Sequence, residues 1–172
     1  MSTLELLRQT RQYYDGKLAE YGPTARGVDW NSEESQRLRF RELMRVIEDD
    51  RDASVLDYGC GYGALRPYLR ERGHRGPYIG FDISQRMIDA ARAANPDATA
   101  QFVSDRGMLA RADYTLASGI FNVKQTAPDE RWQQYVLETI EDLAATSSGG
   151  FGFNALSSYS DREERGSVLY YA

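Results

Sequence analysis

Closely spaced glycines directly after a short apolar run are the clearest chemical signal in this chain. Residues 55–63 read VLDYGCGYG, with Gly59, Gly61 and Gly63 at alternate positions. A strand that turns sharply into a helix uses glycine because glycine adopts unusual backbone angles and lets a ligand approach the main chain. The helix behind such a turn offers unpaired N–H groups to a polar ligand. The spacing therefore predicts a ligand-binding turn, with a purely structural glycine turn as the alternative.

A carboxylate after the next apolar run strengthens the ligand interpretation. Residues 78–81 predict a second strand, and Asp82 follows it, 25 residues after Asp57. In doubly wound folds an acidic residue at this place accepts hydrogen bonds from both ribose hydroxyls. The predicted ligand is a nucleoside-containing cofactor, either a nicotinamide dinucleotide or S-adenosylmethionine.

The charge of Asp57 separates these two cofactors. Gly59, Gly61 and Ala64 satisfy the G-x-G-x-x-A pattern, so spacing alone leaves a dinucleotide open. The Asp57 carboxylate, two residues before the first glycine, repels a pyrophosphate and attracts the α-ammonium group of a methionine moiety. Electrostatics therefore favours S-adenosylmethionine.

Alternating strands and helices must position this turn. Strands are predicted over residues 54–57, 78–81, 99–103, 114–117 and 151–156, and helices over residues 4–20, 32–49, 65–72, 84–95 and 129–146. Asn31 or Ser32 is the predicted N-cap of the second helix, and Ser84 is that of the fourth. The alternation predicts an α/β fold with right-handed crossovers and a doubly wound, mainly parallel sheet covered on both faces.

The last predicted helix has the strongest periodicity. Its apolar stripe is expected to be buried, and Gly149 and Gly150 are expected to end it. The stripe consists of Trp132, Tyr135, Val136, Thr139, Ile140, Leu143 and Ala144. We expect one domain over residues 1–172, with residues 1–50 as a helical lid and residues 51–172 as the core.

Composition limits the function classes. The net charge is −5, and acidic and basic residues are interspersed rather than gathered into a basic stripe, so nucleic acid is not an expected partner. No apolar run approaches the ~20 residues that cross a bilayer, so no membrane partner is expected. The single cysteine, Cys60, rules out an internal disulfide and suggests a cytoplasmic location.

Four segments resemble one enzyme family. VLDYGCGYG resembles motif I of class I S-adenosylmethionine-dependent methyltransferases, and YIGFDIS, residues 78–84, resembles their second motif. FVSD, residues 102–105, resembles their third-strand end, and ADYTLASGIFN, residues 112–122, resembles the segment beneath the methionine. The match runs over about residues 54–156 and implies a Rossmann-like fold, S-adenosyl-L-methionine as cofactor, and methyl transfer.

The resemblance also implies a set of cofactor contacts. Asp57 meets the amino-acid end, Asp82 the ribose, Ile83 the adenine ring and Asp105 the adenine amino group, although a loop-capping role for Asp105 is an alternative. The full set implied is Asp57, Gly59, Cys60, Gly61, Asp82, Ile83, Asp105, Ser118 and Gly119.

Catalytic residues are not identified by the sequence. Methyl transfer is an in-line displacement in which alignment and exclusion of water can suffice. His74 is expected to be a solvated turn residue, and Cys60 a small packing residue rather than a nucleophile. One histidine and one cysteine do not supply a zinc site, so no metal is expected.

The acceptor side is expected in two segments. The loop over residues 22–30, with nearby Tyr13, Tyr14, Tyr21 and Trp30, is a candidate lid, although helix packing explains Tyr13 and Tyr14 equally well. Phe121, Asn122 and Lys124 follow the fourth strand and are expected near the transferred methyl group. Enzymes that methylate amide nitrogens of nucleobases and glutamine typically carry a tetrapeptide of Asn or Asp, two prolines and an aromatic residue at this place. It is absent here, so we expect a small-molecule acceptor.

The C-terminal part departs from the family pattern. Family members normally add a sixth strand and an antiparallel seventh, whereas here residues 157–172 follow the fifth. We therefore expect a truncated or minimal form, with a cofactor-binding but inactive regulatory or assembly protein as the alternative. Without the seventh strand, residues 151–156 form a sheet edge, which either residues 168–171 or a second copy of the chain is expected to cover.

Overall fold

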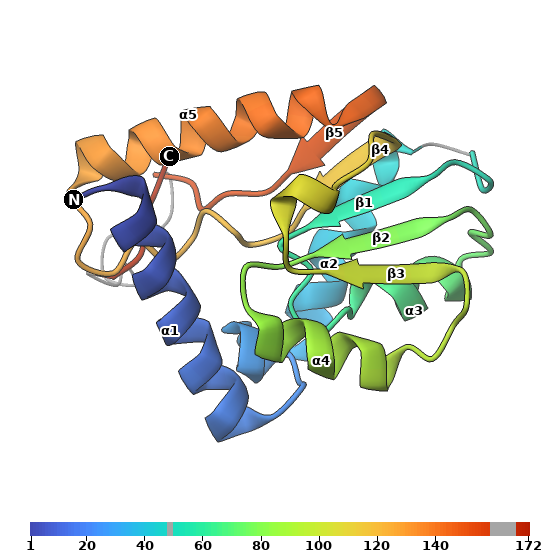
Figure 1. The fold of residues 1–172 in the computed structure, drawn as a ribbon, viewed down its shortest axis with the longest axis horizontal. Coiled ribbons are helices and arrows are strands. Elements are labelled where there is room, and N and C mark those ends of the chain that lie inside the picture. The colour runs from blue at the N-terminus through green and yellow to red at the C-terminus, as the bar shows by residue number, and fades with distance from the viewer. Residues whose placement is uncertain (48–49, 159–167) are drawn as a thin grey trace.

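The computed structural model describes residues 1–47, 50–158 and 168–172 and is built on one parallel sheet (Figure 1). The strand order is β3-β2-β1-β4-β5, and each neighbouring pair is parallel. The strands are β1 (Val55–Tyr58), β2 (Tyr78–Phe81), β3 (Ala100–Val103), β4 (Ala112–Ala117) and β5 (Ser147–Phe153). The predicted doubly wound α/β fold is confirmed. Strand order reverses beside β1, and ligands bind at such a switch point.

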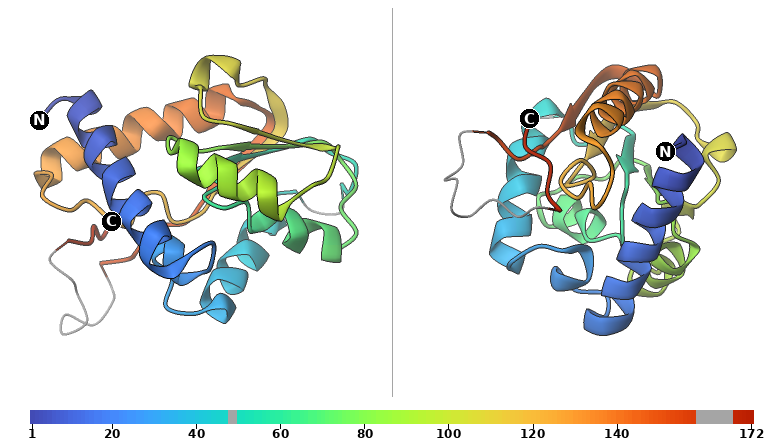
Figure 2. Two further views of the ribbon diagram at one scale, coloured as in Figure 1. Left: turned by 60° about the horizontal axis from the view of Figure 1, so that its bottom comes forward. Right: turned by 90° about the vertical axis from the view of Figure 1, so that its left-hand side faces the viewer.

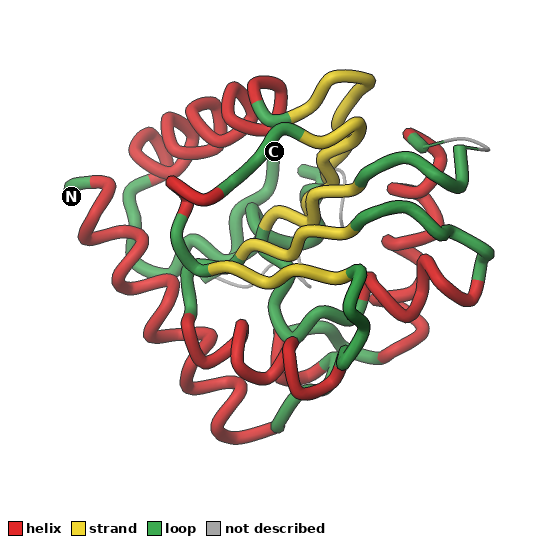
Figure 3. Tube along the Cα trace, turned by 45° about the vertical axis from the view of Figure 1, so that its right-hand side comes forward, coloured by secondary structure: helices red, strands yellow, loops and turns green. Residues whose placement is uncertain are grey.

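Helices cover both faces of the sheet (Figures 1 and 3). Apolar side chains of α2, α3 and α4 share one buried cluster with β1 to β4 on one face, and α5 covers the other face over β4 and β5. The helices are α1 (Thr3–Tyr21), α2 (Glu33–Leu43), α3 (Leu65–Glu71), α4 (Gln85–Ala94) and α5 (Asp129–Ala145), with 3-10 turns η1 (Arg26–Val28), η2 (Met44–Val46) and η3 (Arg106–Met108). No helix in the described ranges has the length and apolar character needed to cross a bilayer.

Two helix starts follow the predicted capping chemistry. The Ser32 side chain accepts a hydrogen bond from the Ser35 amide at 3.1 Å, and the Ser84 side chain accepts one from the Met87 amide at 3.1 Å. Each serine satisfies an amide that has no partner within its own helix. Of the two candidates for α2, Ser32 and not Asn31 is the cap, and the predicted Ser84 cap of α4 is confirmed. The two serines fix where these helices begin.

Helix α1 crosses the carboxyl ends of the strands (Figures 1 and 2). Near its start, Leu6 packs with Trp132 and Ala127 of the α5 region. Further along, the Ser84 hydroxyl donates to the carboxylate of Asp15, which ties α1 to the start of α4. The helix therefore runs across the carboxyl ends of the strands from α5 to α4 and covers the space between them.

The end of α5 corrects one prediction. Helix α5 stops at Ala145 and β5 begins at Ser147, so Gly149 and Gly150 lie inside the strand instead of ending the helix. A Cβ atom on Gly149 would lie 3.1 Å from the Asp113 carbonyl oxygen, where the β4–β5 register shifts. Close approach of two strands therefore explains this glycine. Ala144 is exposed rather than buried, whereas Trp132, Thr139 and Leu143 of the same stripe are buried.

Residues 168–172 lie beside the loop that follows β4. Leu169 pairs antiparallel with Val123, and Tyr171 pairs with Leu156. These contacts place residues 168–172 next to the segments that follow β4 and β5, not along β5 itself. In the described part of the chain, β5 is an edge strand of the sheet, as β3 is on the other side.

Candidate functional site

A cavity of about 250 Å³ opens where β1, β2 and β4 end, beneath α1 and the loop before α2. Its sheet-side wall contains all but one of the residues that the resemblance implies. These are Asp57, Gly59, Cys60, Gly61, Asp82, Ile83, Ser118 and Gly119. Residues from the ends of three strands and from the turn after β1 thus share one space.

The glycine turn is held tightly to β2. The amides of Gly59 and Cys60 both donate to the Phe81 carbonyl oxygen, at 2.7 and 2.9 Å. Gly59 and Gly61 have φ of 81° and 54°, which disfavour residues with a Cβ atom. A Cβ atom on Gly61 would also lie 2.8 Å from Cγ1 of Val28. The turn therefore requires glycine for its backbone and for the loop packed over it.

Asp57 is a buried carboxylate without a cation beside it. Its side chain sits at the end of β1 with 3% of its surface exposed, and Oδ2 accepts a 2.5 Å hydrogen bond from the Tyr78 hydroxyl. Burial raises the pKa of Asp57 to about 7, against the lowering effect of the Tyr78 hydrogen bond. No described lysine or arginine forms an ion pair with it, so the carboxylate is suited to a cationic group from a ligand.

Asp82 ties the turn to the start of α4. Its Oδ2 accepts from the Gly61 amide at 2.9 Å and its Oδ1 from the Ser84 amide at 2.8 Å. Burial raises the pKa of this carboxyl to about 6, although both amide hydrogen bonds lower it. Each carboxylate oxygen has a second lone pair, so Asp82 retains acceptor capacity for hydroxyl groups in the cavity.

Asp105 lies outside the cavity lining. Its side chain is exposed, and Oδ1 accepts from the Gly107 amide at 2.8 Å, which caps η3. The loop-capping alternative therefore describes the geometry of Asp105 in this structure. A short turn after β3 directs the carboxylate to its own backbone rather than toward the adenine side.

The loop before α2 forms part of the cavity wall, as the aromatic pattern suggested. Trp30 packs over Gly119 so closely that a Cβ atom there would lie 2.9 Å from its Cζ2. Tyr14 also lines the cavity, whereas Tyr13 and Tyr21 do not. The Tyr13 hydroxyl instead donates to Asp29 at 2.7 Å, which is a helix-to-loop contact.

A helical wall from α1 and α2 was missed by the sequence reasoning. It faces the strand ends and consists of Thr10, Arg11, Ser35, Gln36, Arg39 and Phe40. Gln36 is buried and accepts a 3.1 Å hydrogen bond from the hydroxyl of Tyr62 in the glycine turn, which holds α2 against the turn. The i, i+4 spacing of Gln36 with Phe40, and of Ser35 with Arg39, was the available signal.

Of the residues expected after β4, Asn122 is the one that reaches the cavity. Its Oδ1 is buried and has no hydrogen-bond partner in the described part of the protein. Phe121 is buried in an edge-to-face contact with Phe153, and Lys124 pairs with Asp129 at 2.9 Å. Asn122 thus contributes an unused hydrogen-bond acceptor beside the cavity.

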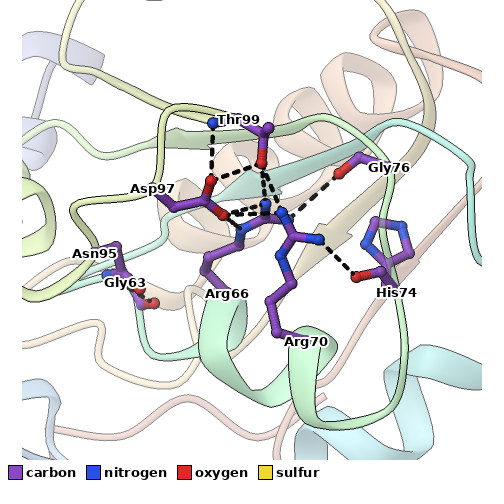
Figure 4. A network of polar contacts seen from close by, with 8 residues as sticks. All are labelled: Gly63, Arg66, Arg70, His74, Gly76, Asn95, Asp97 and Thr99. Carbon is purple, nitrogen blue, oxygen red and sulfur yellow. Dashed lines mark hydrogen bonds and ion pairs between the residues drawn. The ribbon is translucent and has the colours of Figure 1, made fainter.

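His74 lies outside the cavity lining, among the polar contacts at the amino ends of the strands (Figure 4). It is 2% exposed and its Nε2 lies 2.9 Å from the Ala53 carbonyl oxygen, so the expectation of a solvated turn residue was wrong. Burial lowers the pKa of its imidazole. Cys60 is buried, and burial raises the pKa of its thiol, which matches the predicted packing role.

Comparison with known proteins identifies the family. A family model described as a methyltransferase domain matches residues 30–146. The protein Rv1506c of Mycobacterium tuberculosis, which carries a provisional methyltransferase name, is 42% identical over 130 residues, covering 75% of this chain and 78% of that protein. An 18S rRNA (guanine-N(7))-methyltransferase of Bos taurus is 38% identical over 88 residues, and the match spans 51% of this chain and 30% of that enzyme.

A solved structure shares the fold. Magnesium protoporphyrin IX methyltransferase from Synechocystis PCC 6803, with bound S-adenosylmethionine, superposes with a TM-score of 0.66 at 16% identity and covers 96% of this chain and 79% of its own. The parallel sheet, the glycine turn and the family match agree with one another. The chain therefore belongs to the methyltransferase-domain family of S-adenosylmethionine-dependent enzymes.

Proposed function

We propose that this methyltransferase transfers the methyl group of S-adenosylmethionine to a small-molecule acceptor inside the cavity described above. The observation that carries the proposal is the cavity at the strand ends, in which Asp57 and Asp82 have no cationic partner among the described residues. The cofactor-binding residues proposed are Asp57, Gly59, Cys60, Gly61, Asp82, Ile83, Ser118 and Gly119. Asp105 is not retained, because its carboxylate caps η3.

The residues present fit S-adenosylmethionine. Asp57 is suited to bind the α-ammonium group, and Asp82 has free lone pairs for the ribose hydroxyls. Ile83 lies half-buried beside Asp82, where it can pack on the adenine ring. When bound, the cofactor supplies a methyl group on a sulfonium centre.

The chain's own contribution is alignment and exclusion of water. Trp30 and Tyr14 form part of the wall around the strand ends and shield the reacting groups from solvent. Asn122 lines the cavity after β4, where we propose that its side chain helps to orient the acceptor. Such positioning requires no dedicated base when the acceptor is already nucleophilic.

Enclosure of the cavity supports a small acceptor. Residues of α1 and of the loop before α2 line it opposite the strand ends, and we propose that residues 1–50 act as its lid. A net charge of −5 weakens binding to polyanions. RNA is the second candidate because the Bos taurus relative is named as an rRNA methyltransferase, although the match spans 30% of that enzyme.

Two measurements test the proposal. Calorimetry with S-adenosylhomocysteine is expected to show binding to the wild-type chain, and lost binding in Asp57→Ala supports the site. A labelled-methyl screen is then run in parallel on a small-molecule library and on ribosomal RNA. Label incorporated into RNA alone contradicts the small-molecule proposal, and absence of S-adenosylhomocysteine binding contradicts the proposed cofactor site.

A further inference from the structure

Residues 168–172 pair with two segments that are distant from them in sequence. The Val168 carbonyl oxygen accepts a hydrogen bond from the Lys124 amide at 3.0 Å, in the loop that follows β4. The Ala172 amide donates to the Leu156 carbonyl oxygen at 2.9 Å, in the segment that follows β5. Residues 168–172 are thus held between these two segments, at the carboxyl ends of the strands (Figure 1).

This pairing directs Leu169 toward the cavity. Successive side chains of an extended segment point to opposite sides. Tyr170 packs against the buried cluster that contains Leu6 of α1 and Trp132 of α5, whereas Leu169 lines the cavity and is half-buried. The Tyr170 contacts therefore anchor the segment on one side and leave Leu169 on the side of the cavity.

Three apolar side chains line the cavity on this side and are called here the apolar wall. Leu169 forms an antiparallel bridge with Val123, and Leu156 is bridged to Tyr171. The apolar wall consists of Val123, Leu156 and Leu169, and all three contribute to the cavity lining. Pairing of residues 168–172 thus brings together apolar side chains from three separate stretches of the chain.

The charged side chains of the cavity lie elsewhere in its lining. They come from α1, the loop before α2, α2 and the ends of β1 and β2, and they are Arg11, Asp29, Arg39, Asp57 and Asp82. Among the described residues, the segments after β4 and β5 and residues 168–172 contribute no charged side chain to the lining. A charged group placed against the apolar wall would lose water without gaining a partner, whereas an apolar group would gain from burial.

We propose that the apolar wall binds an apolar group of the methyl acceptor, so that the substrate class is small organic molecules with an uncharged hydrocarbon portion. The inference rests on the proposed function, because the cofactor is taken to occupy the sheet-side wall, which contains none of these three residues. Leu169 is then a specificity-determining residue, which selects the acceptor by contact and takes no part in the chemical step.

Two phenols of similar size measure the preference. In para-isopropylphenol a hydrocarbon group stands where para-hydroxybenzoate has a carboxylate. Both are titrated by calorimetry at neutral pH and fixed ionic strength, with and without saturating S-adenosylhomocysteine. Wild type is expected to bind para-isopropylphenol at least about tenfold more tightly, because the apolar wall offers burial and no partner for a charge.

Variants of the apolar wall assign the preference to its residues. Leu169→Asn, which keeps the approximate size, is expected to weaken para-isopropylphenol binding about tenfold. Its affinity for S-adenosylhomocysteine is expected to stay within about twofold of wild type. Val123→Thr, which keeps the shape and adds a hydroxyl, is expected to show a smaller loss in the same direction, and Leu169→Met is expected to bind like wild type. Leu137→Asn is the matched control, because Leu137 is 58% exposed on α5 and lies outside the cavity.

Other outcomes overturn the inference. Equal binding of the two phenols, tighter binding of para-hydroxybenzoate, or a preference that Leu169→Asn leaves unchanged contradicts the apolar wall. An equal loss of S-adenosylhomocysteine affinity in Leu169→Asn assigns this residue to the cofactor and also contradicts it.

Failure of the inference and failure of the proposed function are distinguishable. If wild type binds S-adenosylhomocysteine but neither phenol, the inference fails and the cofactor site stands. If wild type binds para-isopropylphenol through Leu169 but no S-adenosylhomocysteine, the proposed function fails and the apolar wall stands. If it binds none of the three ligands, both fail. Thermal melts of each variant verify that the fold is intact.

Discussion

The carboxyl ends of the parallel strands, called here the carboxyl edge, and their amino ends, called the amino edge, stabilise charged side chains in different ways. At the carboxyl edge, Asp57 and Asp82 are held by a tyrosine hydroxyl and backbone amides, and burial raises the pKa of both. At the amino edge, the Asp97 carboxylate accepts from Arg66 at 2.6 Å and from Arg70 at 3.0 Å (Figure 4). The hydrogen bond from the Thr99 backbone amide, together with those from Arg66, the Thr99 hydroxyl and Arg70, holds the pKa of Asp97 well below its usual range.

The difference distinguishes charged side chains that stabilise the fold from charged side chains that are available to a ligand. Arg66 is 1% exposed and its guanidinium is satisfied by Asp97, Thr99 and the Gly76 carbonyl oxygen, so this buried charge is compensated without a ligand. Among the described residues, the two acids of the carboxyl edge have no cationic partner and Asn122 Oδ1 has no hydrogen-bond partner. Perturbed, unpaired groups in a cavity are typical of binding sites, where a ligand supplies the missing partners.

The largest expected effect is at the glycine turn of the carboxyl edge. Gly61→Val is expected to abolish S-adenosylhomocysteine binding, because the new side chain requires an unfavourable backbone angle and collides with Val28. Calorimetry measures the loss, and circular dichroism is expected to show a folded chain. Gly16→Ala in α1 is the control, since a Cβ atom there has no atom within 4 Å. Normal binding by Gly61→Val means that the turn is only structural.

A smaller effect is expected when the carboxylate after β2 is removed. Asp82→Ala is expected to weaken cofactor binding about 10- to 100-fold, since charge-assisted hydrogen bonds contribute about 1.5–3 kcal/mol. The turn also loses its acceptor for the Gly61 amide. Asp105→Ala is the matched variant and is expected to bind normally. Equal affinities for wild type and Asp82→Ala refute the ribose assignment.

The amino edge is expected to respond in stability alone. Arg66→Met leaves the Gly76 carbonyl oxygen and Thr99 without this donor and is expected to lower Tm by about 5 °C. Its affinity for S-adenosylhomocysteine is expected to stay within about twofold of wild type, because Arg66 does not line the cavity. Differential scanning calorimetry and titration calorimetry on one sample measure both. A large loss of affinity at unchanged Tm contradicts the division between the edges.

The pH dependence of stability tests the unpaired acids. The pKa of Asp57 is raised to about 7 in the folded chain, so the folded state binds more protons than the unfolded state between about pH 4 and 7. The stabilisation from this group is therefore complete at low pH and is lost as pH rises through about 7. Relative to wild type, Asp57→Asn is expected to gain in Tm across this window, and a pH-independent Tm difference contradicts the assignment.

The smallest effect is expected at the unpaired side of β5. Its outer backbone groups have no strand partner in the described part of the chain, and Phe153 is 39% exposed. Such an edge favours strand pairing, so we expect a weak, concentration-dependent homo-oligomer through β5. Light scattering over a concentration series measures it. A monomer at high concentration with fast amide exchange along β5 contradicts this expectation.

Local sequence patterns determined the secondary structure around the site. The glycines at 59 and 61, the acid after residues 78–81 and the serine caps each act through neighbouring backbone, so spacing alone predicted the turn, the strand ends and the helix starts. The periodic stripe of α5 predicted its helix for the same reason.

Tertiary packing decided what those patterns left open. Whether an acid after a strand faces the cavity, as Asp82 does, or its own turn, as Asp105 does, depends on which backbone amides lie nearby. The burial of His74 follows from contacts with segments distant in sequence. Arg39 reaches the cavity because α2 packs on the glycine turn through Gln36. Side-chain direction is set by such long-range contacts, which local spacing does not encode.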